Sequence, residues 1–114
     1  MSNAVGPYTP IVEAGPWLVC SGQIGIADGA LAEGVEAQLV QAMANMAALL
    51  ESKGATLADV TKTTVFLTDM DDYAQMNKIY TEAFGDHRPA RSAVAVAALP
   101  LGAVIEVEAW AYRG

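Results

Sequence analysis

The sequence predicts an α+β domain with one mixed β-sheet and two helices packed on one of its faces. Two segments carry apolar residues at helical spacing, and segments rich in β-branched and aromatic residues precede and follow them. No composition break, repeat or low-complexity tract divides the 114 residues. We therefore expect a single domain over residues 1–114, with its body from Gly6 to Arg113 after a short lead, Met1–Val5.

The first half of the chain is predicted to hold a strand, a short hairpin and a long helix. Trp17–Ile24 is rich in strand formers and lies between Gly-Pro and Gly residues. An Asp-Gly pair then offers a hairpin turn into a short piece around Leu31. Apolar residues at helical spacing predict a helix over Val35–Lys53, with Gly54 at the position of a C-terminal cap.

The second half is predicted to add a strand, a second helix and two more strands. The β-branched run Thr61–Leu67 indicates a strand. Three aspartates at positions 69, 71 and 72 supply a cap and a negative first turn for a helix that ends at Phe84. Arg91–Ala97 and Val104–Ala111 are predicted strands, joined by a turn at residues 99–102.

Right-handed β-α-β crossovers should place both helices on the same face of the sheet and leave the other face open. The alternation of side chains in the last strand assigns Ile105, Val107, Ala109 and Ala111 to the helix side and Val104, Glu106, Glu108 and Trp110 to the open side. In the strand before it, the pattern favours Val94 and Val96 on the helix side and Arg91, Ala93 and Ala95 on the open side. An open face of this kind resembles a subunit interface that contains a few charges.

Charge and composition exclude several classes of protein. Lys and Arg number 6 against 13 Asp and Glu, a net charge of −7, which argues against nucleic acid or an anionic membrane as partner. No apolar stretch approaches the roughly 20 residues that span a membrane, and the N-terminus lacks the pattern of a secretory signal, so we expect a cytoplasmic protein. With one cysteine, Cys20, and one histidine, His87, neither an internal disulfide nor a zinc cluster is expected.

An amide on the second helix is the first candidate for a functional site. Asn77 falls on the predicted apolar stripe of that helix, made of Met70, Tyr73, Tyr80 and Phe84. A buried amide must find hydrogen-bond partners. Asn77 is therefore either a satisfied structural residue or part of a site.

Three charged side chains are the other candidates. Arg91 has a planar guanidinium that can bind a carboxylate through two hydrogen bonds, although at a strand end it could equally be a surface residue. Glu106 and Glu108 share one strand face about 7 Å apart. They either pair with basic residues or include a group that activates a water.

Other catalytic patterns are missing. Ser21 lacks the G-x-S-x-G context, the single His87 argues against a Ser-His-Asp triad, and the glycines have no phosphate-binding spacing. Cys20 is expected to be an inert core residue.

Six short motifs occur in a recognisable order: Gly6-Pro7-Tyr8, CSGQI at 20–24, KTTVFL at 62–67, Asn77 with Tyr80, PARS at 89–92 and IEVEA at 105–109. In this order the sequence resembles the RidA/YjgF family of reactive-intermediate deaminases over nearly its whole length. It departs from many relatives at Ala93 and Ala95, where a Cys and an acidic or amide residue are common, and these departures bear on the shape of the pocket.

The resemblance implies a chorismate-mutase-like fold that assembles as a homotrimer around a central barrel of sheets, with active sites between subunits. It implies cofactor-free hydrolysis of 2-imino acids and their enamine tautomers, such as 2-iminobutanoate and 2-iminopropanoate, to 2-keto acids and ammonia, without a metal. In the matching positions, Arg91 would bind the substrate carboxylate and Glu106 would position the attacking water. The remaining pocket would be lined by Tyr8, Ser21, Asn77 and the backbone around Ala93.

Two other kinds of function stay open. The chain could be a non-catalytic trimer that binds small carboxylates or has a regulatory role, or a pathway-specific divergent relative. Glu106 separates the first of these from the enzyme, since a pure carboxylate binder needs no second acid beside its ligand. A ribonuclease or a chaperone ranks lower, because the acidic balance and the lone His87 suit RNA cleavage poorly and chaperone action leaves no readable motif.

Overall fold

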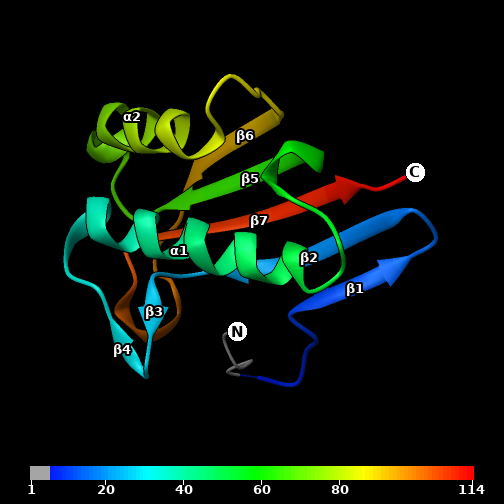
Figure 1. The fold of residues 1–114 in the computed structure, drawn as a ribbon. Coiled ribbons are helices and arrows are strands. Elements are labelled where there is room, and N and C mark those ends of the chain that lie inside the picture. Colours follow the sequence, from blue (N-terminus) through cyan, green and yellow to red (C-terminus); the bar gives the residue numbers. More distant parts are fainter. Residues whose placement is uncertain (1–5) are drawn as a thin grey trace.

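A five-stranded mixed sheet, with two helices on one face, forms the centre of the fold (Figure 1). The structure, a computed structural model, describes residues 6–114, so the lead Met1–Val5 lies outside the described residues. The strands of this sheet are β1 (Ile11–Ala14), β2 (Trp17–Gln23), β5 (Val60–Leu67), β6 (Ala90–Ala95) and β7 (Ile105–Tyr112), and the helices are α1 (Gly34–Glu51) and α2 (Tyr73–Phe84). The predicted fold class, an α+β fold with one main mixed sheet and two helices, is confirmed.

The order of the strands is β1-β2-β7-β5-β6. Strand β7 runs antiparallel to both of its neighbours, β2 and β5, whereas β5 and β6 are parallel. Each helix therefore connects two strands that run in the same direction, and α1 and α2 pack against each other as well as on the sheet. No helix within residues 6–114 is long and apolar enough to cross a bilayer.

The first strand, β1, has no counterpart among the strands predicted from the sequence. Only Ile11 of β1 is buried, so the segment shows no alternating pattern, and the Gly15-Pro16 pair that bounds the predicted strand is the turn joining β1 to β2. The hairpin at Asp28-Gly29 is confirmed, but its strands β3 (Ile26–Ala27) and β4 (Ala30–Leu31) form a separate two-stranded sheet.

The core lies between the sheet and the two helices. On β7 the predicted alternation is confirmed, because Ile105, Val107, Ala109 and Ala111 are all buried. Helix α1 contributes its predicted apolar stripe, and Leu39, Leu49 and Leu50 are fully buried.

The predicted faces of β6 are wrong. Arg91 pairs with Thr63 and Ala93 with Val65, and Thr63 and Val65 are buried beneath α2. Since paired residues point to the same side of a sheet, Arg91, Ala93 and also Ala95 lie on the helix side. Val94 lies on the open side, where it is 43% exposed. In this edge strand the size of the apolar side chains does not indicate which face is buried.

The predicted stripe of the second helix is also shifted. Its buried residues are Met76, Ile79, Tyr80 and Phe84, whereas Met70 and Tyr73 are exposed. Asp69 caps a 3₁₀ turn over Met70–Asp72 before the α-helix begins. The tighter turn changes the phase, so α-helical spacing counted from Met70 does not hold.

Polar side chains of α1 fix the loop that leaves β2. Asn45 donates from Nδ2 to the carbonyls of Ile24 (3.2 Å) and Ile26 (2.9 Å). Gln38, which is buried, donates to the carbonyl of Ala32 (3.0 Å) and accepts from the backbone N–H of Val104 (2.9 Å). These bonds hold Ile24 and the start of β7 in fixed positions beside each other.

Close contact of this loop with α1 requires glycine at position 25. A Cβ on Gly25 would lie 2.4 Å from both Cα and the carbonyl oxygen of Gln38. We expect Gly25→Ala to lower the free energy of unfolding by about 1–3 kcal/mol, because backbone has to move. Urea denaturation measures the change.

The matched control is Gly29→Asn at the tip of the β3-β4 hairpin. Gly29 has a φ of +78° and open space around it, and Asn tolerates this conformation, so the control should cost less than about 1 kcal/mol. Equal effects of the two variants would show that the approach to Gln38 is not what constrains Gly25.

Candidate functional site

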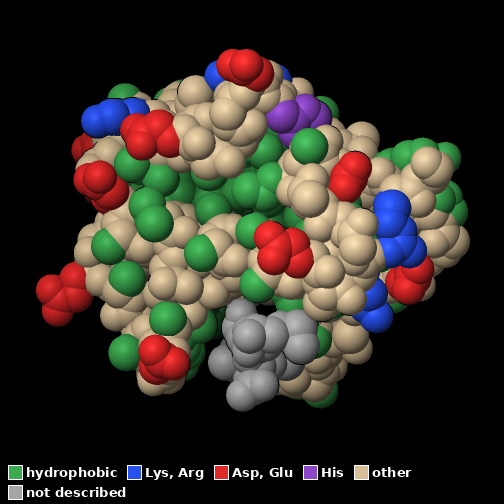
Figure 2. Space-filling view, in the orientation of Figure 1, with side chains coloured by type: hydrophobic (Ala, Val, Ile, Leu, Met, Phe, Trp, Pro, Cys, Tyr) green, Lys and Arg blue, Asp and Glu red, His purple; other side chains and the backbone are tan. Residues whose placement is uncertain are grey.

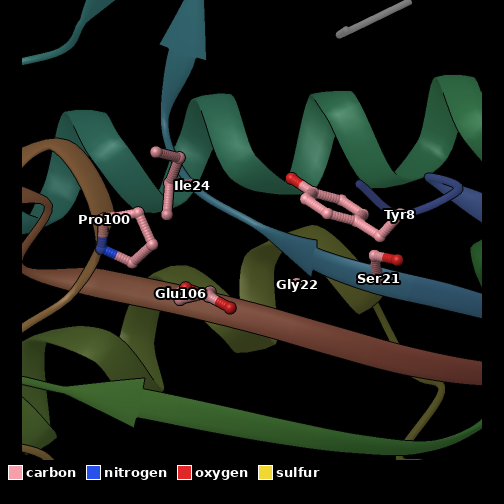
Figure 3. A pocket seen from close by; sticks show the side chains of 6 residues that line it. All are labelled: Tyr8, Ser21, Gly22, Ile24, Pro100 and Glu106. Atoms are coloured by element: carbon pink, nitrogen blue, oxygen red, sulfur yellow. The ribbon is translucent and has the colours of Figure 1, made fainter. Parts of the chain in front are cut away.

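A cavity of about 320 Å³ opens on the side of the sheet away from the helices. It is lined by Tyr8, Ser21, Gly22, Ile24, Pro100 and Glu106. Figure 3 shows Tyr8 and Ser21 on one side of Glu106, and Ile24 and Pro100 on the other. The cavity therefore combines an apolar wall with a single carboxyl group.

A bulge in β2 forms one edge of the cavity. Cys20 pairs with Ala109 and Gln23 with Val107, so two residues, Ser21 and Gly22, lie opposite one residue of β7. Such a bulge redirects side chains locally. It brings the backbone at Gly22 so close to Glu106 that a Cβ there would lie within 1.9 Å of the carboxyl oxygen Oε2. Gly22 thus provides the space that the Glu106 carboxyl occupies.

Ser21 anchors the segment that carries Tyr8. Its hydroxyl donates to the carbonyl of Thr9 (2.7 Å), and its backbone N–H donates to the carbonyl of Pro10 (2.8 Å). The chain ahead of β1 is held against β2 by these two bonds. Tyr8, which is 44% exposed, is thereby kept at the edge of the cavity.

Glu106 is the ionisable group of the cavity. It lies on the open side of β7, paired with Phe66, and is half-buried. Burial raises the pKa of its carboxyl above the ordinary value, and the charge of nearby Glu108 raises this pKa further. Neither glutamate takes part in an ion pair with another residue of the 6–114 segment, where the salt bridge found is Arg113 with Glu13. A carboxyl with a raised pKa in a cavity is suited to accept and return a proton.

Arg91 lies on the other side of the sheet, held by α2. Its Nη1 donates to Oδ1 of Asn77 (2.7 Å) and lies 3.6 Å from the sulfur of Met76, while Nη2 donates to the hydroxyl of Tyr73 (3.0 Å). The guanidinium carbon is 5.0 Å from the ring centre of Tyr80. Hydrogen bonds and a cation–π contact thus fix the orientation of the guanidinium.

The predicted site residues therefore form two groups in one chain. Tyr8, Ser21 and Glu106 surround the cavity on the open side, whereas Asn77, Arg91 and Ala93 lie on the helix side. The expectation that Arg91 shares the open face with Glu106 is wrong, because the register of β6 with β5 turns Arg91 toward α2.

Two other reactive side chains, Cys20 and His87, take part in the packing and hydrogen bonding of the fold. Burial raises the pKa of Cys20 to about 11, so the thiol stays protonated at neutral pH, in agreement with an inert core residue. Nε2 of His87 is hydrogen-bonded to the carbonyl of Val60 (2.6 Å), and its ring packs on Phe84. No group of three or more His, Cys, Asp or Glu residues that could hold a metal occurs in the described part of the chain.

The open face also carries exposed apolar side chains. Val12, Val94, Trp110 and Tyr112 are each more than 40% exposed, and Trp17 contacts both Trp110 and Tyr112 edge to face. On the helix-covered side, charged side chains are scattered among hydrophobic ones (Figure 2). The apolar open face is typical of a surface that another chain covers.

Two sets of residues at these sites were not predicted from the sequence. Gly22, Ile24 and Pro100 line the cavity. Of these, only Gly22 carries a signal in the sequence, because a glycine within a strand suggests that another group lies close to the backbone. Tyr73 bonds Arg91 from the same helix face as Asn77, four residues away. The four-residue spacing of Tyr73 and Asn77 is visible in the sequence. Counting the helix from Met70, however, assigns Tyr73 to the buried stripe.

Glu108 is expected to control part of the pKa shift of Glu106. Removing its charge by Glu108→Gln should lower the Glu106 pKa while leaving it above the ordinary value, because burial is the larger cause. Titration of carboxyl ¹³C signals by NMR measures the shift. Glu82→Gln on exposed α2 surface is the control and should not move the Glu106 pKa; an unchanged value in Glu108→Gln would contradict the assignment.

Comparisons with known proteins identify the family. The family model described as Endoribonuclease L-PSP matches residues 1–113. The 2-iminobutanoate/2-iminopropanoate deaminase of Salmonella typhimurium is 44% identical over 115 residues, covering 96% of this chain and 90% of that protein. RidA from the Antarctic bacterium Psychrobacter sp. has a TM-score of 0.94 at 41% identity, covering 96% of this chain and 91% of that one. TdcF of E. coli, solved with bound serine, has a TM-score of 0.93 at 36% identity, covering 97% and 91%. The resemblance seen in the sequence is thus confirmed, and the chain belongs to the RidA/YjgF family.

Proposed function

We propose that this protein hydrolyses 2-imino acids and their enamine tautomers, such as 2-iminobutanoate and 2-iminopropanoate, to 2-keto acids and ammonia without a cofactor. The observation that carries the proposal is the half-buried Glu106 carboxyl, with its raised pKa, in a cavity beside Tyr8 and Ser21. The deaminase name of the Salmonella relative supports the same reaction.

The proposed chemistry needs one placed water and one proton acceptor. Glu106 takes a proton from the water as its oxygen bonds to the imine carbon, and the C=N double bond becomes a single bond. Starting from the protonated imine, Glu106 passes this proton to the nitrogen. The C–N bond then breaks and ammonia leaves, while the hydroxyl on the same carbon gives its proton to Glu106 and forms the C=O bond. A protonated imine is already electrophilic, so orientation of the reactants supplies much of the acceleration.

Arg91 binds the substrate carboxylate in this proposal. Its guanidinium is fixed by Asn77 and Tyr73, and a guanidinium pairs with a carboxylate through charge-assisted hydrogen bonds. The serine bound to TdcF is a small molecule of this carboxylate-bearing kind. Ala93 lies on the same side of β6, two residues from Arg91, and is partly buried against the core.

A complete site requires two copies of the chain. In a 2-imino acid the carboxylate is one bond from the imine carbon, yet Arg91 and Glu106 lie on opposite sides of one sheet. We therefore propose the chorismate-mutase-like homotrimer, in which the open faces meet around a central barrel and each site joins Arg91 of one subunit to Glu106 of the next. The exposed apolar side chains of the open face support this assembly.

Ribonuclease activity has less support. A net charge of −7 opposes binding to phosphates, and the ring of His87 is already hydrogen-bonded to a backbone carbonyl. The cytoplasmic location expected from the sequence stays a prediction.

The reaction is tested by supplying 2-iminobutanoate from a threonine dehydratase, with semicarbazide to trap free imine, and following 2-keto acid formation. We expect the wild type to accelerate keto-acid release. Arg91→Ala should lower kcat/KM at least about tenfold through loss of charge-assisted bonds, and Glu106→Gln should lower kcat about 10²–10⁴-fold through loss of the proton acceptor.

Matched controls come from the same chain. Arg88→Ala removes an exposed arginine that donates to carbonyls of its own loop, and Glu82→Gln removes an exposed carboxylate of α2; both should keep most of the activity. If the wild type gives only the rate without protein on 2-iminobutanoate and 2-aminoacrylate, the deaminase proposal is wrong and carboxylate binding without turnover takes its place.

The assembly is tested separately by light scattering. The wild type should have three times the mass of the chain. Trp110→Glu places a charge on the apolar open face and should reduce the trimer, whereas Val40→Glu, at a similarly exposed position on α1, should not. A monomeric wild type would contradict the two-subunit site.

A further inference from the structure

The guanidinium of Arg91 has a limited number of free donors. An arginine carries five N–H groups. Asn77 Oδ1 and the sulfur of Met76 take bonds from Nη1, and the hydroxyl of Tyr73 takes one from Nη2. Among residues 6–114 no acceptor is found for one N–H on Nη2 or for the N–H on Nε, so both can bind a ligand. Arg91 therefore meets a carboxylate with two donors while Tyr73 lies directly beside them.

Two tyrosines flank Arg91, and their hydroxyls differ. Tyr80 is buried, and its hydroxyl is hydrogen-bonded to that of Thr63 at 2.7 Å. Tyr73 is 39% exposed. Within residues 6–114 its hydroxyl has Arg91 as hydrogen-bond partner and acts there as the acceptor. The O–H of Tyr73 thus keeps its own proton for donation to a ligand.

We propose that Tyr73 is a third donor for the substrate carboxylate, beside Nε and Nη2 of Arg91. The inference rests on the proposed function, since it assigns the ligand at Arg91 as a carboxylate. A hydroxyl that accepts from a guanidinium is polarised and donates more strongly to an anion. The phenol and the guanidinium together then offer three donors to the four lone-pair positions of one carboxylate.

Tyr73→Phe removes the hydroxyl, and with it the bond that this hydroxyl accepts from Arg91, but it keeps the ring. The ring centre lies 5.5 Å from the guanidinium carbon, and Tyr73→Phe keeps this contact. Because the side chain is exposed, the hydroxyl fills no core space. The substitution should therefore change ligand binding without unfolding α2.

The test uses two probes that differ in charge, 2-oxobutanoate and its neutral amide, 2-oxobutanamide, with binding measured by calorimetry. Tyr73→Phe should weaken 2-oxobutanoate binding about tenfold, as expected for one hydrogen bond to a charged group. Binding of the amide should change by less than about twofold, since the amide lacks the anion that strengthens the bond. Thr81→Val, which removes the hydroxyl of an exposed residue on the same helix α2, is the control and should match the wild type.

A crystal structure with 2-oxobutanoate provides the direct readout. A carboxylate oxygen within hydrogen-bond distance of the Tyr73 hydroxyl supports the inference. An unchanged affinity in Tyr73→Phe, or a carboxylate bound only to Arg91, overturns it and leaves the proposed function intact. If Arg91→Ala also binds 2-oxobutanoate like the wild type, the carboxylate site of the proposed function fails as well.

Discussion

Two helices can cover only one face of a five-stranded sheet, and this constraint shapes the rest of the molecule. Alternate residues of each strand point to opposite sides. Those beneath α1 and α2 form the core, while those on the other side remain exposed, including Trp110 and Tyr112. Burying such aromatic side chains against another chain stabilises an assembly. The same uncovered face also holds the cavity around Glu106.

Local irregularities of the backbone create that cavity. The Ser21–Gly22 bulge interrupts the pairing of β2 with β7, and hydrogen bonds from Asn45 hold the following loop on α1. A regular strand with a side chain at position 22 would fill the space of the Glu106 carboxyl. The carboxyl is consequently half-buried, and this burial, together with the charge of Glu108, raises its pKa.

The two charged groups of the proposed site have complementary environments. Arg91 is held by hydrogen-bond acceptors and aromatic rings from α2, so its orientation is set before a ligand arrives. Preorganised donors of this kind lose little on binding an anion. Glu106 instead lies among apolar side chains and a second carboxylate, which favour its protonated form. The sheet keeps these opposite charges apart within one chain, and so prevents them from neutralising each other.

The sequence by itself determined the fold class, the two helices, four of the five strands in the main sheet, the faces of β7 and the family, because these depend on local periodicity and short motifs. It also named Asn77, Arg91 and Glu106 as candidates from their residue types and spacing, and Tyr8, Ser21 and Ala93 through that resemblance. Only the tertiary structure decided that β1 pairs with β2, that Arg91 lies on the helix side, and that Tyr73 touches it. These features depend on strand register and on the 3₁₀ turn before α2. A one-residue shift in strand register turns each side chain to the opposite face of the sheet. A one-residue change in the 3₁₀ turn changes the phase of the helix that follows. The composition of a short segment encodes neither shift.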